Sequence, residues 1–343
     1  MLPTTGTKNR QFRLKTRPSG RASLENFELV SESIPEPGQN DVLVRTVYLS
    51  LDPTNRIWMS DMDQYMPPVK IGEVMRGLGI GKVEKSNHPN FKEGDYVSGL
   101  VGWQDYVVSG VDDVFPLVKL PPLPISLEAM AGAAGMTGLT AYFGLFDVGQ
   151  PKDQETLVVS AAAGAVGSVV AQLGKLSNLR VVGIAGGSAK CDWLRSELGL
   201  DAAVDYKSPS WKKDFEKATP NGVDINFENV GGEIMEAVYS RMNLHGRMVL
   251  CGLISCYNDA DDIKTRLSLA PALMKRLRIQ GFIITDYVAR FPEATEKIVR
   301  WIAEGKLKHK ETVVEGLENA PGALNMLFDG SNLGKLLVKV SEP

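Results

Sequence analysis

The chain has 343 residues, of which 38 are basic and 41 acidic, so its formal net charge is −3 at pH 7. This length predicts about two domains with well-buried cores. Because no basic run stands out, the charge argues against nucleic acid or an anionic membrane as a partner and favours a small molecule. The three cysteines form no CxxC pair and are too few for a disulfide framework, which predicts a reducing compartment, the cytoplasm.

Residues 41–120 contain short β-type runs separated by turns, among them DVLVRTVYLSLDP and GDYVSGLVGWQDYVVSG. Such runs predict a small β-rich domain. A proline-marked boundary follows at PLPISLEAM and leads into helical stretches rich in small residues. The uncharged stretches 129–146 and 156–174 approach the length of a membrane-spanning helix, but both are rich in small residues and divide into shorter elements, so we expect no membrane segment.

From residue 156 onward, strand-like and helix-like segments alternate. Six apolar runs recur, namely TLVVSAA, RVVGIAG, AAVDY, VDINFENV, RMVLCGLIS and LRIQGFII. This rhythm is typical of a parallel, doubly wound sheet. The tail then returns to a strand, a helix and a strand, which complete the first domain. We therefore predict an α/β chain with a β-rich domain at 1–130, completed by 306–343, and a dinucleotide-binding domain at 131–305.

A loop of small residues joins the first of these runs to a helix, in the sequence TLVVSAAAGAVGS. Ala162, Gly164 and Gly167 occupy the three small positions of the G-x-G-x-x-G pattern, with Ala for the first Gly. Small side chains there let a pyrophosphate approach the backbone at the helix N-terminus, whose dipole stabilises its charge. The pattern alone is weak, but its place between a strand and a helix predicts a dinucleotide site. The alternative is a helix start whose small residues serve packing alone.

The end of the second run predicts which dinucleotide binds. An NAD enzyme is expected to carry an acid there, about twenty residues past the loop, to hold the ribose hydroxyl. This chain has Gly186 and Gly187, which leave room, and Lys190, which supplies a cation. The missing acid favours NADP, with Tyr206 beside the same phosphate or the adenine. Lys190 taken alone fits an ordinary solvated lysine equally well.

Neither a metal centre nor a hydrolase site is predicted. The histidines, His88, His245 and His309, stand in no ligand motif, and the first domain has no cysteine. There is no GxSxG elbow. Without a metal, charge developing on a substrate oxygen must be met by a hydroxyl, a backbone amide or the cofactor ribose. Tyr257, just past the fifth run, is placed to do so, although its position also fits an ordinary loop aromatic.

Taken together, these motifs resemble the zinc-free branch of the medium-chain dehydrogenase/reductase superfamily, in the group of leukotriene B4 dehydrogenase, prostaglandin reductase and curcumin reductase. The similarity covers nearly the whole chain. Its most specific pieces are AAAGAVGS, VVGIAGGSAKC, ENVGG, CGLIS followed by Tyr257 and Asn258, NLGK, SLDP followed by Arg56, and YMPPVKIGEVMRG. Where zinc-dependent relatives carry Gly-His-Glu, this chain has Arg76, Gly77 and Leu78.

The resemblance implies a GroES-like first domain, a Rossmann domain, a homodimer, and NADPH-dependent reduction of carbon–carbon double bonds conjugated to carbonyls. It assigns the pyrophosphate to Gly164, Ala165, Val166 and Gly167, and the adenosine phosphate end to Lys190 and Tyr206. It makes Tyr257 the donor to the substrate oxygen. The rest of the cofactor cleft falls to Asn229, Cys251, Gly252, Leu253, Ile254, Ser255, Tyr257, Phe282, Ile283, Ile284 and Asn332.

Two departures from the family pattern affect the substrate pocket. Thr137 stands where many members have Pro, and Thr54-Asn55 replaces a common Tyr-Met pair. Two alternatives to enone reduction stay open at this point. One is quinone or alcohol oxidoreduction on the same scaffold, of which the alcohol is disfavoured by the missing zinc ligands. The other is a non-catalytic NADPH-binding protein, which the acidic balance and the complete set of cofactor positions disfavour.

Overall fold

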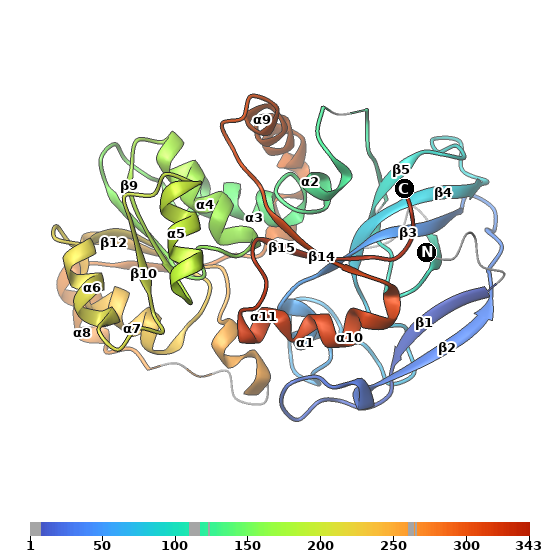
Figure 1. Ribbon diagram of the computed structural model, residues 1–343, viewed down its shortest axis with the longest axis horizontal. Coiled ribbons are helices and arrows are strands. Elements are labelled where there is room, and N and C mark those ends of the chain that lie inside the picture. The colour runs from blue at the N-terminus through green and yellow to red at the C-terminus, as the bar shows by residue number, and fades with distance from the viewer. Residues whose placement is uncertain (1–7, 110–116, 123, 260–263, 265) are drawn as a thin grey trace.

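Two large β-sheets lie side by side in the computed structural model, which describes residues 8–109, 117–122, 124–259, 264 and 266–343 (Figure 1). One sheet is built from the middle of the chain, and the other from its two ends. The fold is therefore the α/β arrangement predicted, with a parallel sheet and a separate β-rich part. The strands of the parallel sheet lie between the predicted domain limits at 130 and 305, and those of the β-rich part lie outside them. The limits themselves stay predictions.

The six predicted apolar runs form one parallel sheet in the order β10-β9-β8-β11-β12-β13. Parallel strands buried on both faces read as continuous apolar runs, which is why the sequence indicated them. The order reverses at β8, which pairs with β9 on one side and β11 on the other. The strands are β8 (Thr156–Val159), β9 (Arg180–Ala185), β10 (Ala202–Asp205), β11 (Val223–Glu228), β12 (Met242–Leu250) and β13 (Arg278–Gly281).

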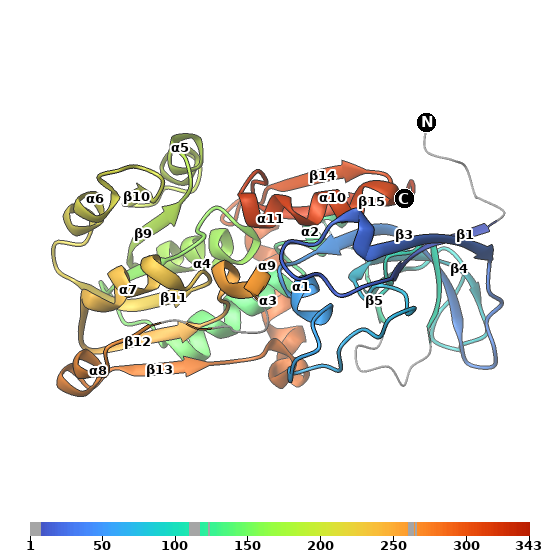
Figure 2. The same cartoon turned by 90° about the horizontal axis from the view of Figure 1, so that it is seen from below.

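Helices cover both faces of this sheet (Figure 2). Along β8, Leu157 and Val159 enter the core shared with α3, α4 and α9, whereas Val158 enters the core shared with α6 and α7. This alternation follows from the two-residue period of a strand. The helices are α3 (Met136–Phe143), α4 (Ala165–Leu176), α5 (Ser188–Ser196), α6 (Trp211–Ala218), α7 (Gly232–Ser240), α8 (Leu269–Lys275) and α9 (Phe291–Ala303).

The β-rich part contains a seven-stranded sheet in which the two ends of the chain meet. Its order is β14-β15-β3-β4-β5-β7, with β6 paired to β3. Its strands are β3 (Val42–Leu51), β4 (Leu78–Ser86), β5 (Tyr96–Leu100), β6 (Tyr106–Ser109), β7 (Val118–Lys119), β14 (Glu311–Glu315) and β15 (Lys335–Lys339). A hairpin of β1 (Lys8–Leu14) and β2 (Phe27–Ser33) closes one side, where Phe27 stacks on the buried Trp103.

Four short helices of the described chain accompany the β-rich part. They are α1 (Thr54–Trp58), α2 (Leu127–Ala131), α10 (Ala320–Leu324) and α11 (Met326–Asp329). Of these, α2 and α10 contact strand β3. The two uncharged stretches divide as predicted, 129–146 into α2, α3 and the start of a π-helical turn at Gly144–Gly149, and 156–174 into β8 and α4. Among the described residues, no helix is long and apolar enough to cross a membrane.

Candidate functional site

A cavity of about 780 Å³ runs between the two parts of the molecule. It extends from the C-terminal edge of the parallel sheet to α1, Leu78 and the C-terminal segment. Crevices at this edge, where the strand order reverses, are the usual ligand sites of doubly wound sheets. Every residue that the sequence predicted for the cofactor or the substrate oxygen lines this cavity, so the structure brings them together, while their roles stay predictions.

At the centre of the cavity lies the N-terminus of α4. Helix α4 begins at Ala165, and Gly164 is its N-cap residue. A Cβ atom on Gly167 would lie 2.3 Å from the Ala161 carbonyl oxygen, so only glycine allows the helix this close to the loop. The cradle thus has the small residues and the helix dipole that a pyrophosphate needs.

The NLGK segment is fastened to this loop. The Gly334 amide donates to the Ala163 carbonyl at 2.8 Å, and the Asn332 side chain donates to the Gly334 carbonyl at 3.0 Å. Gly334 has φ +69°, and a Cβ there would lie 1.8 Å from the Lys310 carbonyl oxygen. Glycine is therefore required at 334, and the C-terminal strand starts against the phosphate loop.

Two lysines meet at the far end of the cavity, beyond β9. The Lys190 ammonium donates to the Gly330 carbonyl at 2.7 Å. Burial lowers the pKa of Lys190, and the charge of Lys207 lowers it further. A Cβ on Gly186 would lie 3.0 Å from both Lys207 Cε and Tyr206 Cε1, so these side chains extend over the glycine. This cationic end fits a phosphate.

Sequence reasoning missed Lys207, which follows Tyr206 directly and lines the same cavity. Its position just past the third strand of the parallel sheet could have identified it, because residues there reach the crevice. The acid at the end of this strand, Asp205, accepts hydrogen bonds from the Gly187 amide at 2.7 Å and the Lys207 amide at 2.9 Å. Asp205 thus stabilises the backbone of the turns after β9 and β10.

A buried carboxylate, also missed, shapes the opposite end. Glu228 Oε1 accepts hydrogen bonds from Ser160 Oγ at 2.9 Å and from the amides of Val230 and Gly231 at 2.7 and 2.9 Å. Burial raises the pKa of Glu228, while these donors oppose the rise. Glu228 thus holds the turn that follows β11. This turn fixes the loop after β12, because the Ile254 amide donates to the Asn229 carbonyl at 3.1 Å.

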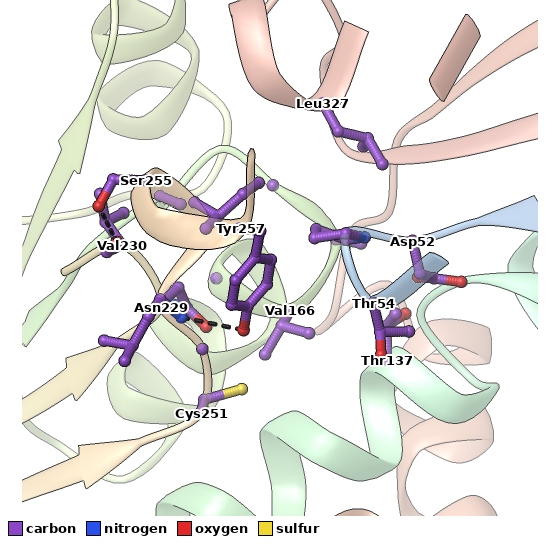
Figure 3. A pocket seen from close by; sticks show the side chains of 18 of the residues that line it. Asp52, Thr54, Thr137, Val166, Asn229, Val230, Cys251, Ser255, Tyr257 and Leu327 are labelled. Atoms are coloured by element: carbon purple, nitrogen blue, oxygen red, sulfur yellow. Dashed lines mark hydrogen bonds between the residues drawn. The ribbon is translucent and has the colours of Figure 1, made fainter. Parts of the chain in front are cut away.

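Tyr257 lies on that loop, in the 3-10 helix Ile254–Asp259, and its ring points into the cavity between Asn229 and Val166 (Figure 3). Its hydroxyl accepts a hydrogen bond from the Leu253 amide at 3.0 Å. Burial raises the pKa of Tyr257 to about 12, so the phenol stays protonated at neutral pH. The described residues show no acceptor for the phenol proton, which leaves it available to a bound molecule.

The other wall comes from the β-rich part and α1. Thr54 and Asp52 lie across the cavity from Tyr257 in Figure 3, where the Asp52 carboxylate points away from the phenol and pairs with Lys335. The Thr54 and Tyr65 hydroxyls are 2.6 Å apart, so a phenol from a different segment stands beside the threonine that replaces the common tyrosine. Thr137, the other departure, donates to the Gly132 carbonyl at 2.9 Å.

Comparisons with known proteins agree with this layout. Residues 10–117 match the N-terminal domain of oxidoreductase, and residues 165–303 match the zinc-binding dehydrogenase domain. The chain is 45% identical over 339 residues to the NADPH-dependent curcumin reductase of Escherichia coli, with 97% of each chain covered. It is 39% identical to the NADP(+)-dependent 2-alkenal reductase of Nicotiana tabacum, covering 97% of this chain and 98% of that protein.

Among solved structures, CurA from Vibrio vulnificus in complex with NADPH matches with a TM-score of 0.91 and 45% identity, covering 97% of this chain and all of that one. The chain belongs to the zinc-free branch of the medium-chain dehydrogenase/reductase superfamily.

In this zinc-free reductase, ordinary packing fills the positions where zinc-dependent relatives carry Gly-His-Glu. The Arg76 guanidinium donates to the Pro67 carbonyl at 2.9 Å and lies 5.3 Å from the centre of the Trp58 ring. A Cβ on Gly77 would lie 2.6 Å from a Leu49 methyl group. Across the described part of the chain, no three His, Cys, Asp or Glu side chains gather as metal ligands would.

Proposed function

We propose that this protein reduces the carbon–carbon double bond of α,β-unsaturated ketones and aldehydes with NADPH. The observation that carries the proposal is one continuous cavity with a phosphate-binding helix start at its centre, two lysines at one end and a protonated phenol at the other. The printed names of the relatives, a curcumin reductase and a 2-alkenal reductase, support the same substrate class.

The cofactor residues follow from this assignment. Gly164, Ala165, Val166 and Gly167 hold the pyrophosphate by backbone amides and the helix dipole. Lys190 and Lys207 bind the extra phosphate, and Tyr206 lies along the adenosine. When bound, NADPH supplies the hydride. The other residues that line the cavity and would contact the cofactor are Asn229, Cys251, Gly252, Leu253, Ile254, Ser255, Phe282, Ile283, Ile284 and Asn332.

Tyr257 acts on the substrate oxygen. Negative charge develops there as hydride reaches the β-carbon, and a fixed hydroxyl donor stabilises this charge most in the transition state. The Leu253 amide holds the Tyr257 oxygen, so the phenol proton is oriented before the substrate arrives. The wall opposite carries apolar side chains suited to a conjugated carbon chain, among them Trp58, Leu78, Met136, Leu327 and Phe328.

The position of the transferred hydride tests the proposal. With 3-nonen-2-one and NADPH deuterated at C4, we expect the saturated ketone with deuterium at its β-carbon, detected by NMR and mass spectrometry. An allylic alcohol with deuterium on the carbinol carbon would contradict enone reduction. Faster turnover of quinones than of every enone in a matched panel would favour quinone reduction on the same scaffold.

A homodimer in the cytoplasm completes the proposal. Strand β13 is the last of the parallel sheet in the described chain, and apolar side chains of α8 beside it are exposed, with Leu269 at 74%, Leu273 at 72% and Met274 at 69%. An unpaired edge flanked by apolar side chains suits a second copy related by a two-fold axis. Leu273→Glu should shift the sedimentation coefficient from dimer to monomer; a wild-type monomer would contradict this part.

A further inference from the structure

Reduction of an enone needs a proton on the α-carbon as well as hydride on the β-carbon, and Tyr257 is engaged at the oxygen. The following step rests on the proposed function and concerns the source of that proton. A donor must line the cavity, carry a proton that no protein carbonyl holds, and lie on a wall from which it can reach the substrate.

Most of the hydroxyls near the substrate end fail the second condition. Thr137 and Thr140 donate to the backbone carbonyls of Gly132 and Met136 at 2.9 and 2.8 Å, and Ser255 donates to the Val230 carbonyl at 2.6 Å. These bonds use the single proton that each hydroxyl has.

The Tyr65 hydroxyl meets the second condition. It accepts a hydrogen bond from Trp58 Nε1 at 3.1 Å and shares one with the Thr54 hydroxyl at 2.6 Å, in which either oxygen can donate. When Thr54 donates to Tyr65, the Tyr65 proton is released toward the cavity. Tyr257 has the same arrangement on the other wall, because a fixed N–H fills one position on its oxygen and leaves its proton available.

Tyr65 also has the required place. Its partner Thr54 lies across the cavity from Tyr257, Asn229 and Cys251 (Figure 3). Tyr65 itself lines the cavity and is 45% exposed, so solvent can resupply a proton to it. Lys335, the ammonium on this side, is only 2% exposed and is held by the Leu51 carbonyl and the Asp52 carboxylate at 2.7 and 2.9 Å.

We infer that Tyr65 protonates the α-carbon from the face opposite the hydride. Hydride adds to the β-carbon, and its electron pair moves the π electrons onto the α-carbon and oxygen as an enolate. The enolate takes the Tyr65 proton, so the Tyr65 O–H bond breaks as the α-carbon C–H bond forms. The phenolate is reprotonated from solvent through Thr54, and the balance is one enone, one NADPH and one proton to one ketone and one NADP⁺.

This transfer is downhill, because a ketone enolate is a much stronger base than a phenolate. Burial raises the pKa of Tyr65 above its ordinary value, while the bonds from Thr54 and Trp58 lower it. The phenol therefore stays protonated at neutral pH until the enolate forms. Thr54 is a positioning residue in this scheme, since it acts through Tyr65.

The stereochemistry of the product tests the inference. Reduction of (E)-3-methyl-3-penten-2-one with C4-deuterated NADPH creates stereocentres at both carbons, and we expect the wild type to give one diastereomer, with hydride and proton added to opposite faces. Tyr65→Phe should still place deuterium on the β-carbon but give a mixture at the α-carbon. Its kcat should fall at least tenfold, toward the roughly 10²–10⁴-fold typical of a lost general acid.

Two variants serve as controls. Tyr96→Phe removes a phenol outside the cavity and should match the wild type in rate and stereochemistry. Thr54→Val should slow turnover yet keep a single α-configuration, because the Tyr65 proton remains. NADPH affinity, followed by fluorescence, should be unchanged in Tyr65→Phe, which shows that the variant is folded.

Three results have distinct meanings. A single α-configuration at the normal rate in Tyr65→Phe would overturn the inference, and so would addition of both hydrogens to the same face by the wild type. Failure of the wild type to form any β-labelled saturated ketone would instead overturn the proposed function itself.

Discussion

The preference for NADPH over NADH can be assigned to single side chains. In Lys190→Ala, the half-buried ammonium that lies against the Gly330 carbonyl is removed. Because that bond already holds the side chain, a phosphate gains a charged hydrogen bond without ordering a flexible lysine. Such bonds contribute about 1.5–3 kcal/mol, which corresponds to roughly 10- to 150-fold in affinity.

Lys207→Ala should matter less. The side chain of Lys207 is exposed, and exposed ion pairs contribute at most about 1 kcal/mol, or roughly fivefold in affinity. Burial lowers the pKa of Lys190 most, and the charge of Lys207 lowers it further, so the two lysines interact and their effects on phosphate binding should not simply add.

Titration of the cofactors against each variant, followed by fluorescence or calorimetry, measures these effects. The Kd ratio of NADH to NADPH should fall by most of its value in Lys190→Ala and only slightly in Lys207→Ala, while the Kd for NADH stays constant in both. Lys212→Ala, on the exposed side of α6, is a matched control for the loss of one positive charge. An unchanged ratio in Lys190→Ala, or an equal loss of NADH affinity, would refute the assignment.

Four further outcomes are expected. Tyr257→Phe should lower kcat by up to roughly 10²–10³-fold with NADPH affinity retained; a normal rate would remove Tyr257 from the reaction. Activity should survive prolonged chelation, with no stoichiometric metal by elemental analysis; loss restored by zinc would contradict this. Burial and the Glu228 charge raise the pKa of Cys251 to about 12, so its alkylation by iodoacetamide should be roughly 30- to 100-fold slower than that of a free thiol, and Glu228→Gln should speed it in mass-spectrometric time courses. Glu311 raises the pKa of His309, so this pair should stabilise the fold fully below pH 6.5 and lose that contribution as the pH rises through the folded-state pKa; His309→Gln should flatten the pH dependence of the unfolding free energy in that window.

Much of the fold could be predicted because its signals are local. A parallel strand buried on both faces needs a continuous apolar run, as at Thr156–Val159, and a helix start close to a sheet needs glycine, as at Gly167. Tyr257 could be placed because residues just past the strands of such a sheet reach its crevice. These inferences require only the neighbours along the chain.

The missed residues depend on contacts that the sequence does not display. Glu228 resembles any strand-end acid until the structure shows three donors converging on one of its oxygens. Tyr65 opens the motif YMPPVKIGEVMRG, but the motif assigns it no role, and only folding brings its hydroxyl to Thr54. In the sequence, Lys207 cannot be distinguished from the many lysines that lie on the surface without a ligand. Each needed a tertiary contact to distinguish a site residue from an ordinary one.

The two walls of the cavity are joined through Arg56, which is only 1% exposed. From α1 its guanidinium donates to the Pro18 and Gly20 carbonyls at 2.9 Å each, and to the Asn258 carbonyl at 3.4 Å. Asn258 follows Tyr257, so the segment carrying the phenol is fastened on one side to Arg56 and on the other to the turn that Glu228 holds. A buried guanidinium that loses one carbonyl partner leaves a costly unsatisfied donor. The position of Tyr257 is therefore coupled to the approach of α1, which brings Thr54 and, through their hydrogen bond, the Tyr65 hydroxyl to the opposite wall of the cavity.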